Sequence, residues 1–316
     1  MRCVAIKHDG ALVVEERADP EPGRDEVLVA VKAAGLNAAD LLQRRGFYPA
    51  PPDSPPDIPG LELAGEVVAL GPGVLSRFRP GSRVMALVGG GAQATHALVP
   101  EQQLMAVPDG VSFAEAGGFP EAFTTAHDAL RTQCGLRAGE RVAIHGAAGG
   151  VGTAAVQIAH GLGAHVTATV RDRVRHDEVR ALGADEVVTP DEFAETSGYD
   201  VILELVGGPN MEANLNALNT GGRISVIGVG AGGNANVNLL ALMQKRAAIY
   251  GSTLRARPRD QKADAARRVE ADVVALLADG RVRVPVLATF SLDEVEAAYD
   301  RFAAGGKLGK IVLTTT

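Results

Sequence analysis

Cysteine is scarce in this sequence: Cys3 and Cys134 are the only two among 316 residues. Two cysteines cannot build the several cross-links of a small secreted domain or the thiolate cluster of a structural zinc site. No segment approaches the roughly 18 consecutive apolar residues of a membrane-spanning helix. The first residues, Met1 to Asp9, lack the apolar core of a signal peptide and are typical of a strand. These absences predict a cytoplasmic protein without a membrane partner.

Positive charge is not in excess either. The 31 lysines and arginines are outnumbered by 38 aspartates and glutamates, so the net charge is −7. The densest basic cluster, Arg255, Arg257 and Arg259, is interpreted as a solvated loop. An acidic chain argues against a nucleic-acid partner, and we expect a small-molecule substrate instead.

What the sequence does contain, over residues 1–119, is a series of short apolar segments separated by glycine, proline and aspartate. They lie at 12–14, 27–31, 63–70, 83–88 and 94–99. Short strands at near-regular spacing predict a barrel-like β-rich domain. One helix is expected at 37–45, and the proline-rich stretch 48–60 is expected to be a loop.

From residue 120 to 262 strands alternate with helices. The six predicted strands lie at 141–145, 165–170, 186–188, 200–206, 223–229 and 248–252. This alternation predicts an α/β fold with a doubly wound, six-stranded parallel sheet. Residues 263–316 are expected to return to the first domain, which is then discontinuous in sequence.

The stretch Val142 to Ile144, a glycine-rich turn and an apolar helical pattern follow one another directly. The turn reads A-x-G-x-x-G over Ala147 to Gly152, with alanine in place of the first glycine. Small residues let the backbone approach a pyrophosphate, and the helix N-terminus faces its negative charge. Because a strand precedes the turn and a helix follows it, we predict dinucleotide binding by Ala148, Gly149, Gly150 and Val151.

Several strings together resemble one known family. They are LNAADLLQRRGFY at 36–48, PGLELAGE at 59–66, GGAQ at 90–93, PEAFTTA at 120–126, AAGGVG at 147–152 and GKIVL at 309–313. The chain is similar over its whole length to the zinc-free NAD(P)H:quinone oxidoreductase (zeta-crystallin-like) branch of the medium-chain dehydrogenase/reductase superfamily. This resemblance implies a GroES-like catalytic domain, a Rossmann domain and hydride transfer from a nicotinamide.

The resemblance also explains residues that are missing. Zinc-dependent relatives place a cysteine at the position of Asn37, a histidine at that of Leu61 and a second cysteine near Glu121. Neither a leucine nor an amide is a normal zinc ligand, and Glu62 alone does not make a site. We therefore expect no metal.

The residues after the second strand bear on the choice of cofactor. Val170 stands where NAD-preferring folds usually carry an acid, and Arg171 and then Arg175 follow as candidates to bind a 2′-phosphate. These arginines favour NADPH. Asp172 leaves the alternative open, because a shift of one residue would make it an acid of the NAD type, and the arginines can also be a solvated helix start.

Further cofactor contacts are implied by position in the family. Thr125 matches a threonine that contacts the nicotinamide, although helix capping is an alternative. Ile227, Gly228, Val229 and Leu254 are expected along the cofactor in the same way. Lys307 lies where relatives bring a polar side chain to the cofactor, and the alternative is a surface lysine.

Asn37 and Tyr48 are the candidates for substrate contact. Hydride delivery to a quinone or an enone leaves an oxyanion, which an amide NH₂ and a phenol can both stabilise as hydrogen-bond donors. Tyr48 is also a candidate proton donor, with solvent as the alternative. The structural alternatives are a helix N-cap for Asn37 and packing on the proline-rich loop for Tyr48.

The function expected from these observations is NADPH-dependent reduction of quinones or related activated carbonyls. The alternatives are reduction of enones or enoyl thioesters, and a non-catalytic NADPH-binding redox sensor. A homodimer is expected, because the apolar strand from Ala248 to Ser252 can pair with its symmetry mate.

Overall fold

The computed structural model describes residues 1–315, which form two compact units. The first comprises residues 1–124 and the chain from Leu254 onward, and the second comprises residues 125–253. The first unit is therefore discontinuous, as expected. Its return begins at Leu254, earlier than the expected residue 263, because Leu254 and Ala265 pack against Leu87 of that unit.

The first unit is built on a seven-stranded sheet in which six strands follow the order β14-β15-β3-β4-β5-β7 and β6 pairs with β3. A separate antiparallel pair joins β1 and β2. The bounds are β1 (Arg2–Ile6), β2 (Leu12–Glu16), β3 (Glu26–Gly35), β4 (Glu62–Leu70), β5 (Arg83–Leu87), β6 (His96–Pro100), β7 (Leu104–Ala106), β14 (Val286–Ser291) and β15 (Lys310–Thr314). The predicted β-rich domain is confirmed, and its five predicted segments correspond to β2 through β6, whereas β7 was not predicted.

Strand β3 is the centre of this sheet. Val27, Val29 and Val31, which are every second residue of the strand, point into the same apolar core as Leu63 and Val67 of β4. The two-residue period of a strand places such residues on one face. The last strand, β15, pairs antiparallel with the end of β3, where Val312 lies opposite Gly35. This pairing brings the carboxyl-terminal segment to the start of the loop after β3.

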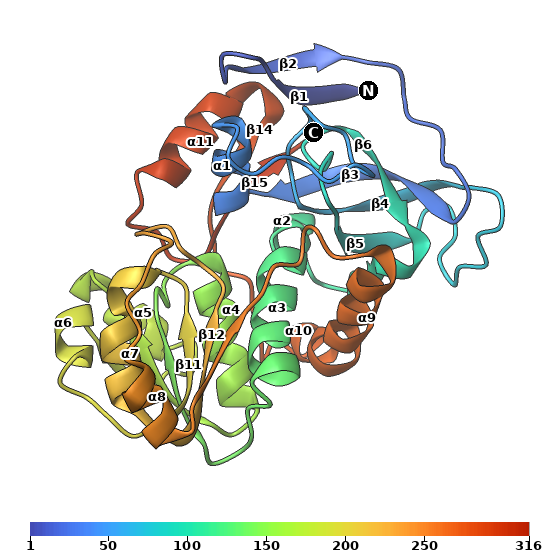
Figure 1. The fold of residues 1–316 in the computed structure, drawn as a ribbon. Helices are drawn as coiled ribbons and strands as arrows, with labels where there is room; N and C mark the ends of the chain where they lie inside the picture. Colours follow the sequence, from blue (N-terminus) through green and yellow to red (C-terminus); the bar gives the residue numbers. More distant parts are fainter. Residues whose placement is uncertain (316) are drawn as a thin grey trace. The chain divides into compact units, whose positions relative to one another are not determined.

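Helices surround this sheet in the first unit. They are α1 (Ala38–Arg44), α2 (Phe113–Gly117), α9 (Arg259–Val269), α10 (Ala275–Ala278) and α11 (Val295–Ala303), with a π-helical turn at Glu270–Val274 and 3₁₀ turns at Glu101–Gln103 and Leu292–Glu294. Figure 1 shows α9 beside β5, in agreement with the packing of α9 on β5 and β7.

The second unit is a six-stranded parallel sheet in the order β10-β9-β8-β11-β12-β13. Its strands are β8 (Arg141–Ile144), β9 (His165–Thr169), β10 (Glu186–Val188), β11 (Tyr199–Glu204), β12 (Leu218–Val226) and β13 (Ala248–Gly251). The doubly wound sheet is confirmed. The order reverses between β8 and β11, and ligands of such sheets bind at this point, beyond the carboxyl ends of the strands.

Helices cover both faces of this sheet (Figure 1). They are α4 (Gly150–Gly161), α5 (His176–Arg180), α6 (Pro190–Phe193), α7 (Met211–Ala217) and α8 (Leu239–Lys245), with 3₁₀ turns at Arg173–Arg175 and Gly208–Asn210. Because the crossovers from β8 and from β11 run in opposite directions, α4 and α7 lie on opposite faces. The sequence from Thr124 to Cys134 is typical of a helix. In the structure this helix begins earlier, as α3 (Pro120–His127), and continues as a π-helical segment, Asp128–Gln133.

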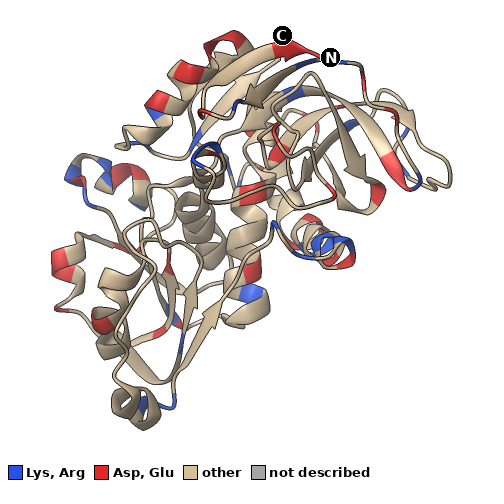
Figure 2. Cartoon of the chain, turned by 45° about the horizontal axis from the view of Figure 1, so that its top comes forward, with Lys and Arg blue, Asp and Glu red and all other residues tan. Residues whose placement is uncertain are grey.

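Charged residues of both signs are interspersed over the elements, for example along α9 (Figure 2). Within residues 1–315, no helix combines the length and the apolar character needed to cross a membrane.

Candidate functional site

The glycine-rich turn after β8 has the backbone of a nucleotide cradle. Gly146 adopts a left-handed conformation (φ 60°), and a Cβ on Gly152 would lie 2.4 Å from the Gly146 carbonyl oxygen and 2.6 Å from the Cα of Ala147. Helix α4 therefore leaves the strand so closely that only glycine fits at position 152. The left-handed residue is Gly146, one position before Ala147, which explains why the first glycine of the fingerprint can be alanine here.

The start of α4 is open to an anion. Gly149 is the N-cap and supplies no side chain to the helix amides, and the first turn holds no acidic residue. Gly150 and Val151 begin the helix, so their N–H groups have no carbonyl partner one turn earlier. Ala148, Gly149 and Gly150 are partly exposed. These features fit the pyrophosphate of a dinucleotide.

A buried network supports this edge of the sheet. The carboxylate of Glu204, at the end of β11, is fully buried and accepts hydrogen bonds from the Val206 amide (2.6 Å), the Gly207 amide (2.8 Å) and the Asn214 side chain (2.7 Å). His145 Nε2 lies 2.7 Å from Asn214 Oδ1, and burial lowers the pKa of this histidine. The network fixes the loop after β11 beside the turn after β8. Glu204 was not among the predicted site residues, because a glutamate that ends a strand has no distinguishing signal in the sequence.

The residues predicted after β12 meet this loop. The amides of Ile227 and Gly228 donate to the backbone oxygen of Glu204, at 2.9 and 3.2 Å. A Cβ on Gly228 would lie 2.4 Å from the Leu205 carbonyl oxygen, so the two chain segments can approach only at a glycine. Val229 follows and is half exposed. These three residues therefore lie at the same edge of the sheet as the glycine-rich turn.

The arginines after β9 differ in their partners. Arg173 pairs with Glu192 and Arg175 with Glu178. Arg171 is exposed and makes no hydrogen bond or ion pair with any residue between 1 and 315. Asp172 accepts a hydrogen bond from the Val174 amide (3.1 Å) and so caps the 3₁₀ turn that follows. The carboxylate thus has a local structural role, whereas Arg171 is available to a ligand.

The helix-capping alternative requires Thr125 to stand just before the first turn of a helix, and it does not. It lies inside α3, which begins at Pro120, and its side chain is buried. Helix capping is therefore not its role.

In the first unit, Lys310 is the centre of a buried cluster. Its ammonium lies 2.6 Å from Glu62 Oε1, 2.6 Å from Asn37 Oδ1 and 2.9 Å from the Leu36 carbonyl oxygen. Asn37 Nδ2 donates to Glu62 Oε1 (3.0 Å) and to the Gly35 carbonyl oxygen (3.3 Å). Lys310 and Glu62 were not singled out as a pair by the sequence analysis.

This geometry changes the interpretation of Asn37. Its side chain is 7% exposed, and both amide hydrogens already have acceptors. The amide therefore serves the buried cluster and has no donor left for a substrate oxygen. Asn37 also occupies the N-cap position of α1, which was the structural alternative.

The same cluster bears on metal binding. Residues 1–315 contain no group of three or more histidine, cysteine, aspartate or glutamate side chains arranged to hold a metal ion. Leu61 is buried and apolar, and the oxygens of Asn37 and Glu62 face an ammonium. The donor set does not fit zinc.

Asp40 lies in α1 and is completely buried. Its carboxylate accepts hydrogen bonds from the Asn37 amide (2.8 Å) and the Gly60 amide (3.0 Å), and so ties the start of the helix to the loop before β4. Burial raises the pKa of Asp40 to about 6.

This raised pKa predicts how stability depends on pH. The native state holds the Asp40 proton up to about pH 6, whereas the unfolded chain releases it near pH 4. The free energy of unfolding should therefore fall as pH rises from 4 to 6, by up to about 3 kcal/mol, and the loss should be complete above that range. Urea unfolding of the wild type and of Asp40→Asn across this range tests this, because a stability difference that does not change with pH would contradict it.

Tyr48 lies just after α1, and a buried arginine holds it. Arg255 is 5% exposed, so the expected solvated loop is wrong at this residue. Its guanidinium donates to the Tyr48 carbonyl oxygen (2.8 Å), to the Gly89 carbonyl oxygen (2.7 Å) and to Gln43 Oε1 (2.6 Å). It also lies over the Tyr48 ring, 5.1 Å from its centre.

The Tyr48 hydroxyl makes no hydrogen bond to any residue in the described part of the chain. Burial raises the pKa of Tyr48, and the guanidinium of Arg255 opposes part of this effect. The phenol is therefore protonated at neutral pH. It is a hydrogen-bond donor on a ring that Arg255 contacts, and its proton is available.

The two remaining predicted residues also lie in the first unit. Leu254 packs in its core, against Leu87 and Ala265. Lys307 places its ammonium over the Phe302 ring. Burial, together with neighbouring cations, lowers the pKa of Lys307 to about 7. Lys307 is therefore partly buried, unlike the surface lysine that was the alternative.

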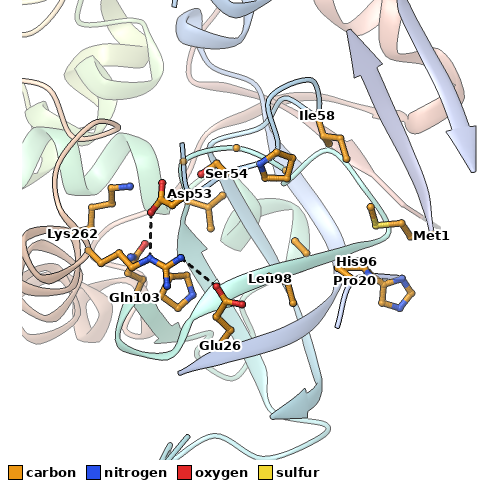
Figure 3. Close-up of a pocket in the computed structure, with 18 residues that line it drawn as sticks. Met1, Pro20, Glu26, Asp53, Ser54, Ile58, His96, Leu98, Gln103 and Lys262 are labelled. Carbon is orange, nitrogen blue, oxygen red and sulfur yellow. Dashed lines mark hydrogen bonds and ion pairs between the residues drawn. The ribbon is translucent and has the colours of Figure 1, made fainter. Parts of the chain in front are cut away.

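Figure 3 shows a separate pocket of about 140 Å³ in the first unit. Arg259 forms ion pairs there with Asp53 and Glu26, both at 3.3 Å. None of the residues predicted from the sequence as site residues lines this pocket. Tyr48, the predicted substrate contact, is not among its lining residues.

Comparisons with known proteins match two family models to this chain. Residues 23–109 match the family model described as the alcohol dehydrogenase GroES-like domain, and residues 150–274 match that described as zinc-binding dehydrogenase. Acryloyl-coenzyme A reductase of Metallosphaera sedula is 31% identical, with all of both chains covered. Quinone oxidoreductase of Homo sapiens is 30% identical, over 99% of this chain and 97% of that protein.

A third relative, erythronolide synthase EryA2 of Saccharopolyspora erythraea, is 39% identical over 92% of this chain, but the chain spans only 8% of that protein. Among solved structures, quinone oxidoreductase of Pseudomonas syringae pv. Tomato DC3000 superposes with a TM-score of 0.87 at 28% identity, over 99% of both chains. Mycobacterial Rv1454c, in complex with NADPH, superposes with a TM-score of 0.88 at 25% identity over the full length of both.

Proposed function

The chain belongs to the medium-chain dehydrogenase/reductase family, and we propose that it is an NADPH-dependent quinone reductase that works without zinc. Two features together carry the proposal: the Tyr48 hydroxyl is an available hydrogen-bond donor, and the polar cluster around Lys310 has its oxygens already engaged. Arg255 holds the Tyr48 backbone carbonyl and lies over the Tyr48 ring, which leaves the hydroxyl available, whereas the oxygens of Asn37 and Glu62 are engaged by Lys310.

The protein's own residues have distinct roles in this proposal. NADPH supplies the hydride when it is bound, with its pyrophosphate at the start of α4 and its 2′-phosphate near Arg171. As the hydride arrives, negative charge develops on the substrate oxygen, and the Tyr48 hydroxyl donates a hydrogen bond to it. The cation of Arg255, over the Tyr48 ring, favours that charge. The final proton comes from Tyr48 or from solvent.

A second candidate is reduction of an enone or an enoyl thioester. The similarity to acryloyl-coenzyme A reductase favours it. Hydride would then go to the β-carbon, and Tyr48 would donate to the enolate oxygen. A third possibility, from another class, is a redox sensor that binds NADPH without turnover.

The test compares three electrophiles in parallel: a small benzoquinone, an enone and an enoyl thioester, with the loss of nicotinamide absorbance as the readout and NADH as the control. Fast turnover of the quinone with NADPH supports the proposal. Turnover of the enone or the thioester alone would move the assignment to the second candidate. Tight NADPH binding with no turnover would favour the sensor.

The preference for NADPH predicts a specific effect at Arg171. Removing this guanidinium in Arg171→Ala should weaken NADPH binding by about tenfold, the value of one charge-assisted contact, and leave NADH binding unchanged. Arg173→Ala is the matched control, since Arg173 is already paired with Glu192. Calorimetric titration with both cofactors checks this, and an equal loss for NADPH and NADH would count against the 2′-phosphate contact.

We also propose that the second unit forms a homodimer. Strand β13 is the edge of its sheet, and apolar side chains are exposed beside it, at 67% for Leu239, 71% for Met243 and 39% for Tyr250. A second copy that continues the sheet would cover these side chains. Sedimentation should give a dimer for the wild type and a monomer for Leu239→Glu/Met243→Glu. Leu75→Glu, which alters a still more exposed leucine of the first unit, should remain dimeric.

A further inference from the structure

Three oxygens converge on one point inside the first unit. The Leu36 carbonyl oxygen, Asn37 Oδ1 and Glu62 Oε1 lie 2.9, 2.6 and 2.6 Å from Lys310 Nζ. We call them the oxygen cage. An ammonium group has three N–H donors, and each of the three oxygens accepts one. Lys310 is 3% exposed and Glu62 is completely buried, so water does not share in this solvation.

The surrounding backbone is shaped for this cage. A Cβ on Gly35 would lie 2.3 Å from Glu62 Oε1, and a Cβ on Gly118 would lie 3.1 Å from the Lys310 side chain. The second carboxylate oxygen, Oε2, accepts a hydrogen bond from the Glu121 amide at 2.8 Å. Glycines thus leave room for the carboxylate and for the lysine stem, and the free face of the carboxylate is fixed by backbone.

We propose that the oxygen cage is a binding site for a primary ammonium ion, R–NH₃⁺. In this protein the Lys310 side chain supplies that ion. A variant with a shorter side chain at position 310 then leaves an empty site that binds a small alkylammonium ion from solution. The charge balance supports a monovalent ion, because the cage carries the single negative charge of Glu62. Distances of 2.6 to 2.9 Å are those of N–H···O contacts, whereas Mg²⁺ binds oxygen at about 2.0–2.1 Å.

The number of atoms that a truncation of Lys310 removes predicts which ion fits best. Lys310→Ala keeps Cβ and removes three carbons and the nitrogen. A separate ion must stand at a non-bonded distance from Cβ, so ethylammonium fills the space and butylammonium is too long. Tetramethylammonium has the charge but no N–H donor.

The experiment measures the thermal unfolding midpoint of Lys310→Ala with and without these chlorides. Ethylammonium at about 0.1 M should raise the midpoint by about 2 °C or more, by mass action on the native state. Butylammonium, tetramethylammonium and sodium should not. The wild type, with its cage filled, and Lys307→Ala, which leaves the cage intact, should not respond. Equal shifts for all four salts, or no shift with ethylammonium, would overturn the proposal.

A second pair of variants covers the case in which Lys310→Ala does not fold. Lys310→Met fills the stem volume and leaves the Glu62 charge without a cation, whereas Lys310→Met/Glu62→Gln also removes that charge. The double variant should recover at least half of the midpoint lost in Lys310→Met, or should fold where the single variant does not. A double variant no more stable than Lys310→Met would show that Lys310 does not act as the cation of this cage, and would overturn the proposal. These readouts do not depend on the proposed reaction.

Discussion

Replacing Tyr48 by phenylalanine is expected to lower kcat for quinone reduction by about 10²-fold, the usual effect of losing one donor to a developing oxyanion. The ring and its contact with Arg255 remain in the variant, because the guanidinium interacts with the ring face and the backbone carbonyl. KM should therefore change little, and the loss should be in the chemical step. Steady-state kinetics with a benzoquinone measures both constants.

The control for this prediction is Phe47→Ala, which removes an exposed aromatic one residue away and should leave kcat within about twofold. NADPH affinity should be the same in Tyr48→Phe and the wild type. If Tyr48→Phe keeps most of its activity, the hydroxyl is not the donor, and solvent must stabilise the oxyanion and supply the proton.

The raised pKa of Tyr48 has a consequence for the pH profile of this pair. The phenol keeps its proton across the neutral range, so the advantage of the wild type over Tyr48→Phe should be constant there. It should decline only above the ordinary phenol pKa of about 10. A ratio that falls near pH 7 would indicate another titrating group.

The fold follows from local patterns in the sequence. The strand, glycine-rich turn and helix from Arg141 to Gly161 are specified by neighbouring residues, as are the short strands of the first unit. The predicted order of a doubly wound sheet then follows from handedness rules that apply to any such chain. Boundaries were less accurate, since α3 begins at Pro120 and the return begins at Leu254 because of packing that no local pattern encodes.

The site was harder to predict, because its polar residues act through partners far away in the chain. Lys310 and Asn37 are 273 positions apart, and Arg255 and Gln43 are 212 apart. A lysine or arginine in a sequence is most often exposed, so nothing local marks these two as buried. Because Asn37 Nδ2 donates to Glu62 and to the Gly35 carbonyl oxygen, the amide has no donor left for the role expected of it. The role of Tyr48 stays a prediction.

The second large effect is expected at Gly152. In Gly152→Ala the new Cβ must stand 2.4 Å from the Gly146 carbonyl oxygen unless the turn opens. The atom that it meets is backbone, and α4 is packed on β8 and β9, so the neighbours cannot give way at little cost. Overpacking of this kind costs about 1–3 kcal/mol. Since the displaced turn is the proposed pyrophosphate cradle, NADPH affinity should fall by about ten- to a hundredfold.

The matched control is Gly233→Ala in the same unit, where a Cβ would meet no atom within 4 Å. The chain has no tryptophan, so the fluorescence of bound NADPH can be followed without interference from indole. Thermal unfolding without cofactor separates a general loss of stability from a local one, because a local change weakens binding far more than it lowers the midpoint. Unchanged NADPH affinity in Gly152→Ala would show that the turn tolerates opening, and the cofactor would then have to be held chiefly by the loops after β11 and β12 and by Arg171.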